Sequence, residues 1–203
     1  MAGLKAAVGD RIPSRAECEA LMAQYAMRAN IVEHSLEVMN VALAIIDNLK
    51  SDVQTNRDLV IAATLLHDIT KTRSLETREN HALSGGTLLR ELGFTSTAEI
   101  VEQHVIMRDI NLGGRLEERE IVYYADKRVR HTVIVTLEER VADLIDRYGT
   151  TEAIRTQILQ NKQQALLVEQ KIAGFLKGDM HQQKGQSLEF PSLAKRGKGR
   201  FNR

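Results

Sequence analysis

The chain has 203 residues, with 28 basic and 27 acidic side chains and a net charge of +1. This length lets one domain bury a substantial core without disulfides, and the single cysteine, Cys18, excludes both an intrachain disulfide and a multi-cysteine zinc site. A lone cysteine is typical of a reducing compartment and no apolar run reaches about 18 uncharged residues, so we expect a cytoplasmic protein with no membrane partner.

The charge is spread unevenly along the chain. Residues 180–203 carry six basic side chains and one acidic side chain, so they contribute +5 and leave −4 for residues 1–179. Bulky apolar residues are few there, and burial cannot offset the entropy lost on ordering the segment. We therefore expect a disordered basic tail over 179–203, for which a solvated end is favoured over a nucleic-acid contact.

Two prolines and abundant alanine, leucine, glutamate and arginine favour helix, and no stretch alternates apolar with polar residues long enough to indicate a sheet. The sequence therefore predicts an all-α fold. We expect an N-terminal helical extension over 1–28, a central domain over 29–149, and a C-terminal helix over 150–178 that packs on that domain.

The first two predicted helices of the central domain place polar side chains among apolar ones. The segment 30–50 has an apolar stripe that includes Val38, Val41 and Ile45, and His34 lies on this stripe. The segment 59–69, LVIAATLLHDI, is apolar on every face, which indicates a helix enclosed by its neighbours. The dipeptide His67-Asp68 ends that enclosed helix.

Capping residues delimit the next two predicted helices. Asn80 is placed to cap a helix over 81–92 that begins at His81 and is closed by Gly93, while Gly85 and Gly86 allow close backbone approach. Ser96 and Glu99 have the spacing of a capping box for a short helix that turns His104 inward.

The remaining helices follow at 117–130, 136–149 and 151–177. The first brings Asp126 onto an apolar face with Val122 and Ala125, and Thr136 and Glu139 form a capping box for the second. The residues expected to face inward on the last two helices are Leu137, Val141, Leu144, Ile145, Tyr148, Ile154, Ile158, Leu166, Ile172 and Leu176.

Six polar residues thus fall on or next to apolar helical faces: His34, His67, Asp68, His81, His104 and Asp126. One inward histidine is more often a hydrogen-bonded core residue than a ligand, but a buried carboxylate needs a cation or hydrogen bonds to offset its desolvation. A divalent cation satisfies both acids, and neutral imidazoles complete its shell without adding charge. Mixed nitrogen and oxygen ligands suit iron, manganese, cobalt or nickel, with magnesium and zinc as further options.

The order and spacing of these residues resemble the signature of the HD-domain metal-dependent phosphohydrolases over about residues 30–148. The matching positions are His34, His67-Asp68 within LLHDITK, and Asp126 within YYADKRV. The resemblance implies a helical bundle with the metal site at its centre, in which these four residues hold one ion and His81, His104 and a bridging Asp68 hold a second. Thr70 stands where this family usually has glycine, so we expect the turn after the ligand pair to differ.

The resemblance also implies hydrolysis of a phosphate ester or anhydride, with water activated by the metal and with Asp68 and Lys71 as catalytic residues. The substrate that we expect from this resemblance is a nucleotide or another small phosphorylated metabolite. Lys71 matches the family's phosphate-contacting lysine, and Arg108 and Lys127 are further phosphate-binding candidates. We interpret Arg73 and Arg130 as surface cations and His131 as a histidine at a helix C-terminus rather than a general acid.

Two other functions are compatible with the same ligands: a diiron oxygenase of the same superfamily, and a non-catalytic metal-binding or ligand-binding module. The cyclic-dinucleotide phosphodiesterases are disfavoured because this chain has a single histidine at position 104 and lacks their glycine-tyrosine-proline motif. The number of ions, the substrate and the oligomeric state are left open by the sequence.

Overall fold

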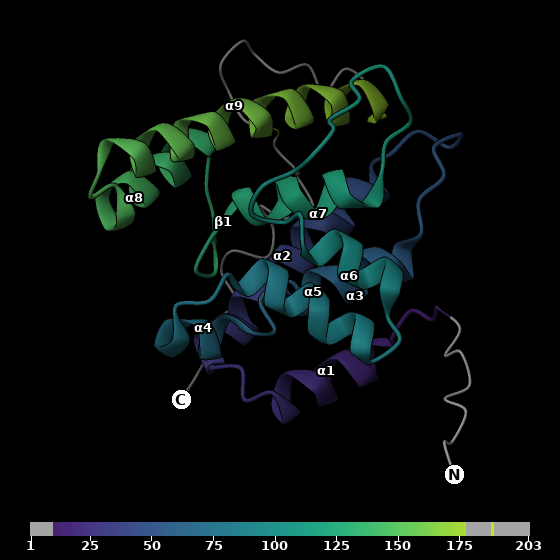
Figure 1. Ribbon diagram of the computed structural model, residues 1–203. Coiled ribbons are helices and arrows are strands. Elements are labelled where there is room, and N and C mark those ends of the chain that lie inside the picture. The colour runs from purple at the N-terminus through teal and green to yellow at the C-terminus, as the bar shows by residue number, and fades with distance from the viewer. Residues whose placement is uncertain (1–9, 178–187, 189–203) are drawn as a thin grey trace, which may run out of the picture.

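The computed structural model describes residues 10–177 and residue 188, and this part of the chain is helical apart from one short hairpin (Figure 1). In chain order the elements are α1 (Arg15–Gln24), α2 (Ala29–Asp47), α3 (Arg57–Leu66), α4 (Lys71–Thr77), α5 (His81–Glu91), α6 (Thr95–Val101), α7 (Glu118–Lys127), β1 (Val129–Arg130), β2 (Val133–Ile134), α8 (Leu137–Tyr148) and α9 (Glu152–Phe175). The predicted all-α class is confirmed, and the antiparallel pair β1–β2, of two residues per strand, is the addition.

Helix α2 lies at the centre of the molecule and packs along α3 and α7. Val38, Val41 and Ile45 on α2 are fully buried in a cluster that also takes in α7 and the C-terminal half of α9. A second cluster joins α3 to α1, α5 and α6 around Leu65 and Leu66. Among the described helices α2 is the one long and apolar enough to cross a membrane, and its apolar side chains are covered by its neighbours, as in a core helix.

The capping signals around α5 and α8 are confirmed. The Asn80 side chain accepts hydrogen bonds from the first turn of α5, and Thr136 and Glu139 form the capping box of α8. Gly93 has φ of 83°, and the amides of Gly93 and Phe94 donate to carbonyls of the last turn of α5. This arrangement is a Schellman motif, in which glycine is the residue that adopts the left-handed conformation without strain.

The capping box predicted for Ser96 and Glu99 is wrong. Helix α6 begins at Thr95 after Phe94, and no side chain caps it. Ser96 instead donates its amide and its hydroxyl to the two carboxylate oxygens of Asp10, at 3.1 and 2.5 Å. Because Asp10 is distant in sequence, local spacing could not reveal this competing acceptor.

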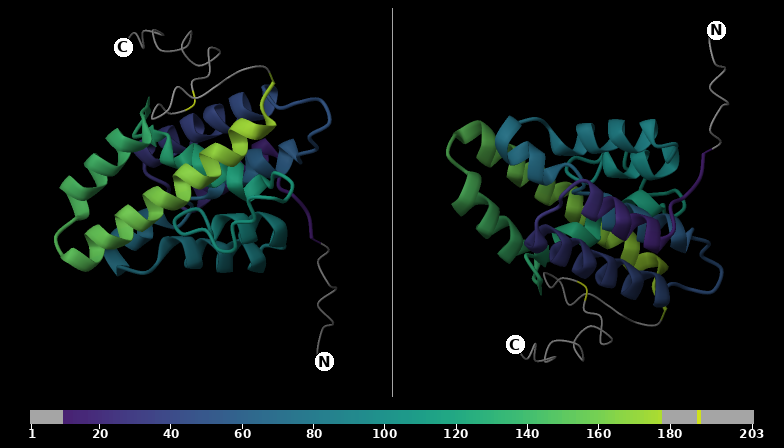
Figure 2. Two further views of the ribbon diagram at one scale, coloured as in Figure 1. Left: turned by 90° about the horizontal axis from the view of Figure 1, so that it is seen from above. Right: turned by 90° about the horizontal axis from the view of Figure 1, so that it is seen from below.

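Helices α8 and α9 form an antiparallel hairpin whose closed end projects beyond the other helices (Figure 2). Leu137, at the base of α8, is buried, but Tyr148 is 49% exposed and Ile154 is 39% exposed. The inward packing predicted for Tyr148 and Ile154 is therefore wrong, and Val141 and Leu144 are only partly buried. Only the C-terminal half of α9 contributes to the core.

Leu188 is the one residue after 177 that the structure describes, and it is buried against α7 and α9. Its amide donates to Glu169 Oε1 at 3.0 Å, and its carbonyl accepts from Arg128 Nη1 at 2.7 Å. The Tyr124 hydroxyl joins the same network by donating to Glu169 and accepting from Arg128. Leu188 falls within the segment 179–203 that is predicted to be a disordered tail, and the rest of that segment lies outside the described residues.

A buried ion pair connects α7 to α9. Lys171 Nζ lies 2.7 Å from Glu120 Oε1, and both side chains are 1% exposed. Lys171 also donates to the carbonyl of Asn111, and the second oxygen of Glu120 accepts the amide of Glu117. These additional hydrogen bonds satisfy both charges, which is the condition under which a buried pair is tolerated.

We predict that Lys171→Met lowers the free energy of unfolding by about 3–5 kcal/mol, because it leaves the Glu120 carboxylate buried without its cation. Urea unfolding followed by circular dichroism measures the change. The double variant Glu120→Gln/Lys171→Met removes both charges and keeps an acceptor for Glu117, so it should recover most of the loss. Equal stability of the single and double variants would show that the pair does not hold α7 and α9 together.

Candidate metal centre

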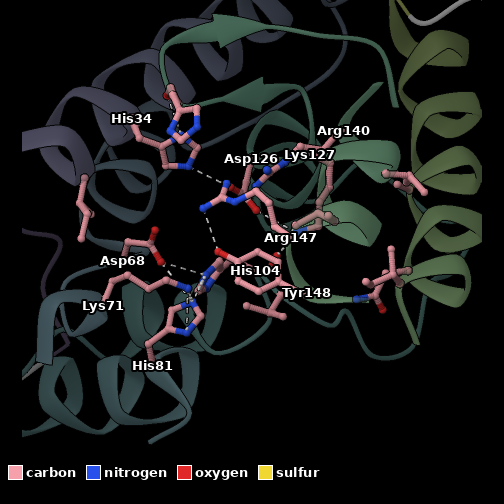
Figure 3. A pocket seen from close by; sticks show the side chains of 18 of the residues that line it. His34, Asp68, Lys71, His81, His104, Asp126, Lys127, Arg140, Arg147 and Tyr148 are labelled. Carbon is pink, nitrogen blue, oxygen red and sulfur yellow. Dashed lines mark hydrogen bonds and ion pairs between the residues drawn. The ribbon is translucent and has the colours of Figure 1, made fainter. Parts of the chain in front are cut away.

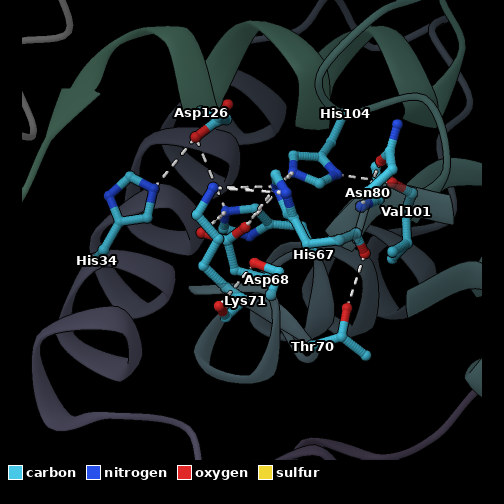
Figure 4. A network of polar contacts seen from close by, with 12 residues as sticks. His34, His67, Asp68, Thr70, Lys71, Asn80, Val101, His104 and Asp126 are labelled. Carbon is cyan, nitrogen blue, oxygen red and sulfur yellow. Dashed lines mark hydrogen bonds and ion pairs between the residues drawn. The ribbon is translucent and has the colours of Figure 1, made fainter. Parts of the chain in front are cut away.

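His67 and Asp68 lie where α3 ends, in the turn that leads to α4. Helix α3 ends at Leu66 and is apolar over most of its length, which brings the two residues into the interior. His67 is fully buried and Asp68 is 9% exposed. Both residues are therefore buried, as predicted. Figure 4 shows the polar contacts around them.

Three of the histidines have Nδ1 directed at a backbone carbonyl. Nδ1 of His34 lies 3.0 Å from the carbonyl of His131, that of His67 2.8 Å from Thr64, and that of His104 2.6 Å from Val101. A carbonyl only accepts, so Nδ1 carries the proton in each ring. In the neutral imidazole, Nε2 is then left as the lone-pair donor that a metal requires.

The Nε2 atoms converge on two carboxylates. The Nε2 of His34 is 3.1 Å from Asp126 Oδ1, and the Nε2 of His67 is 3.5 Å from Asp68 Oδ2. On the other side of Asp68, Oδ1 lies 3.1 Å from Nε2 of His81 and 3.5 Å from Nε2 of His104.

Among the described residues, two groups have ligand atoms that all lie within 4.8 Å of one another: His34 with His67 and Asp68, and Asp68 with His81 and His104. Asp68 belongs to both groups.

This set of ligand atoms fits a divalent cation, because one of them is a buried nitrogen that lacks a hydrogen-bond partner among the described residues. Nε2 of His67 is buried, and no hydrogen-bond partner for it exists among the described residues. An unsatisfied buried acceptor of this kind costs about 1–3 kcal/mol, whereas a bound cation would satisfy it. Nε2 of His81 and Nε2 of His104 approach to 3.2 Å, which is also the arrangement expected of two ligands that share an ion.

The protonation states suit the same role. Burial, together with the nearby His104 and His34, lowers the pKa of His67 to about 4, so this imidazole is neutral at pH 7. Burial opposes the ionisation of Asp68, but His67, His104 and His81 outweigh it and hold the pKa of this carboxyl well below its usual value. The centre therefore presents an ionised carboxylate and a neutral imidazole at neutral pH.

Asp126 on α7 is held by Lys127. Lys127 Nζ lies 2.8 Å from Asp126 Oδ2, and the other oxygen, Oδ1, faces His34. Burial opposes the ionisation of Asp126, but Lys127 and His34 outweigh it and hold the pKa of this carboxyl well below its usual value. The same ammonium donates to the carbonyl of His104 at 2.6 Å and lies over the Tyr123 ring. The structure thus gives Lys127 a positioning role that the phosphate-binding prediction did not include.

Thr70 has backbone angles of φ −99° and ψ 4°, which do not require glycine. Its hydroxyl donates to the carbonyl of His81 at 2.8 Å and accepts from the hydroxyl of Ser84 at 3.0 Å. Thr70 therefore ties the turn after Asp68 to the first turn of α5, where His81 lies. A Cβ on Gly85 would approach a methyl group of Val101 to 3.2 Å, so the close contact expected at this glycine is present.

The cluster opens into a cavity of about 390 Å³, shown in Figure 3. Lys71 lines this cavity beside Asp68, with Nζ 3.4 Å from Nε2 of His81. Arg108 is exposed and is absent from the cavity lining, so the structure does not bring this phosphate-binding candidate to the cluster. Arg73 forms a surface ion pair with Glu79.

His131 occupies the turn between β1 and β2 with φ of 57°, so its predicted place at a helix C-terminus is wrong. Its side chain is exposed and lines the cavity, and its carbonyl orients His34. Strands of two residues are too short to show the alternation of apolar and polar side chains by which a strand is predicted, and this explains the error.

The sequence analysis missed three cations of the cavity wall: Arg140 and Arg147 on α8, and Lys162 on α9. Arg140 has the helical spacing that places it with Leu137, Val141 and Leu144. A cation within an otherwise apolar stripe is a signal that could have identified this wall.

Comparison with known proteins gives one match. A sequence model of the HD domain matches residues 31–151, which is more than half of the chain and includes all six residues of the cluster. No curated protein and no solved structure matches the chain. The helical fold, the central cluster and this match agree, and the chain belongs to the HD-domain family.

Proposed function

We propose that this protein is a metal-dependent phosphohydrolase that cleaves a phosphate ester or anhydride of a nucleotide or another small phosphorylated metabolite. One observation carries the proposal: Asp68 is shared by two groups of candidate ligands at the end of a cavity that five cationic side chains and two carboxylates line. Cationic side chains on a cavity wall favour a phosphate over a neutral substrate.

The residues of the cluster have distinct proposed roles. When bound, divalent ions there would supply an activated water and neutralise charge on the phosphoryl oxygens. Asp68 presents Oδ2 towards His67 and Oδ1 towards His81 and His104, so a single carboxylate would serve both ions. Lys71 lies at the cavity wall beside Asp68, where its ammonium would pair with a phosphoryl oxygen.

The test combines elemental analysis of the purified protein with a screen for phosphate release. The screen covers nucleotides, dinucleoside polyphosphates and sugar phosphates, each with manganese, iron, cobalt and nickel. We expect bound metal and release of phosphate from at least one class. Oxygen consumption after aerobic reconstitution with iron would support a diiron oxygenase instead, and metal binding without turnover would support a binding module.

We predict that Asp68→Asn, which keeps the shape of the side chain and removes its charge, lowers metal affinity by at least about 100-fold, because both groups lose their shared carboxylate. Metal content after gel filtration and phosphate release should fall together. Asp58→Asn is the matched control, because Asp58 is an exposed carboxylate on the first turn of α3, the helix that ends just before His67 and Asp68. Full metal content in the Asp68 variant would contradict the assignment.

We predict that Thr70→Gly selectively weakens the ion held by His81 and His104, by about 10–100-fold, because α5 loses the hydrogen bond at the carbonyl of His81. Titration with manganese, followed by electron paramagnetic resonance, counts the ions bound at each concentration. Thr70→Ser keeps the hydroxyl and should retain wild-type binding. If glycine and serine gave the same titration, the hydroxyl would have no part in placing His81.

A further inference from the structure

A buried guanidinium joins Leu188 to the hairpin β1–β2. Arg128 directly follows α7 and is 5% exposed. Its Nη1 donates to the carbonyl of Leu188 at 2.7 Å, and its Nε donates to the carbonyl of Val135 at 2.7 Å. The amide of Val135 returns a hydrogen bond to the carbonyl of Arg128 at 2.8 Å. Because Arg128 precedes β1 and Val135 follows β2, these hydrogen bonds close the base of the hairpin.

Leu188 completes the surroundings of this guanidinium. Its side chain is 3% exposed and packs in the cluster that includes α2, α7 and α9. Its amide donates to Glu169 Oε1 at 3.0 Å, and the same oxygen lies 3.8 Å from Arg128 Nη1. Nη1 carries two N–H groups, for which the described residues provide the Tyr124 hydroxyl and the Leu188 carbonyl. Without Leu188 one of these buried donors loses its acceptor, so the position of Arg128 depends on this residue.

The hairpin in turn orients one ligand of the His/Asp cluster. Each strand has two residues, so the turn between them is placed by the base of the hairpin. In that turn the carbonyl of His131 lies 3.0 Å from Nδ1 of His34 on α2. The carbonyls that orient His67 and His104 come from residues three positions earlier in the chain, within the same turn of backbone. The orientation of His34 is therefore the one of these three that depends on a distant segment.

On these grounds we infer that Leu188 is a positioning residue of the metal centre. Leu188 holds Arg128, Arg128 holds the base of the hairpin β1–β2, and the turn of the hairpin holds the imidazole of His34. Two groups of candidate ligands share Asp68, and this series of contacts ends in the group that contains His34. The inference therefore gives Leu188 a role for the ion of that group and none for the ion of the group that contains His81. It rests on the metal centre of the proposed function and is independent of the substrate.

Titration of the full chain with manganese, followed by isothermal titration calorimetry, tests the inference in two backgrounds. His81→Ala leaves the group that contains His34, and His34→Ala leaves the group that contains His81. The test variant is Leu188→Asp, which places a charge in an apolar site beside the Glu169 carboxylate. We expect it to weaken manganese binding about 10-fold in the His81→Ala background and less than about twofold in the His34→Ala background. A general loss of stability would act in both backgrounds, so the difference reports the positioning of His34.

Hydrogen exchange of the metal-free protein follows the first part of the same series of contacts. The amide of Val135 donates to the carbonyl of Arg128, and Leu188→Asp should raise its exchange rate at least about 10-fold because the base of the hairpin opens more often. The amide of Phe94, which donates to the carbonyl of Leu89 at the end of α5, should exchange at the wild-type rate.

Two variants serve as controls. Leu188→Met keeps an apolar side chain of similar volume and should retain wild-type affinity in both backgrounds. Leu167→Asp introduces the same charge at a leucine of α9 that is 40% exposed, and it should also leave both affinities unchanged. Thermal unfolding shows whether each variant is folded. If Leu188→Asp does not fold, Leu188→Ala takes its place, because it removes apolar contacts without adding a charge, and it should show the same difference between backgrounds.

Equal weakening in the two backgrounds, no weakening in either, or unchanged exchange at Val135 would overturn the inference and leave the proposed function standing. Metal binding without phosphate release would overturn the proposed function and leave the inference standing. Absence of manganese binding by the unmodified chain would overturn both.

Discussion

The ionised carboxylate of Asp68, at the end of an apolar helix, is the constraint on which the centre depends. Burial alone would favour the neutral acid, and no lysine or arginine forms an ion pair with it among the described residues. Imidazoles surround it instead, and they are themselves desolvated, so the cluster gains most from a divalent cation. The need of the buried Asp68 carboxylate for a cation therefore underlies both the stability of the cluster and its proposed chemistry.

The helical bundle orients the cluster through backbone carbonyls. The carbonyls that hold Nδ1 of His67, His104 and His34 come from α3, the end of α6 and the β1–β2 turn. A carbonyl fixes both the tautomer and the ring plane, and it adds no charge to a site that already has two carboxylates. Lys127, on α7, contacts its neighbour Asp126 and also donates to the carbonyl of His104, so it joins α7 to the segment that follows α6.

Much of this could be predicted from the sequence, and the omissions share a physical origin. Helical periodicity and the apolar run before His67 identify helices and buried ligands because those signals are local. The hydrogen bonds of Ser96 to Asp10, of Thr70 to His81 and of His34 to the His131 carbonyl each join residues distant in sequence. Helical periodicity also shows that one face of a helix is apolar, but it does not show what packs against that face. For this reason the sequence analysis predicted that the apolar face of α8 packs in the core.

The residues that line the cavity come from two parts of the sequence. The six residues of the cluster and all of α8 fall inside the matched segment 31–151, whereas Ile158 and Lys162 of α9 lie beyond it. The C-terminal half of α9 is fixed to α7 by the buried Lys171–Glu120 pair, and its N-terminal half extends from this anchor to α8. Because this cavity wall is anchored through the core, its side chains can differ without disturbing the cluster. The geometry of the cluster is thus independent of the side chains that α8 and the first half of α9 present to the cavity.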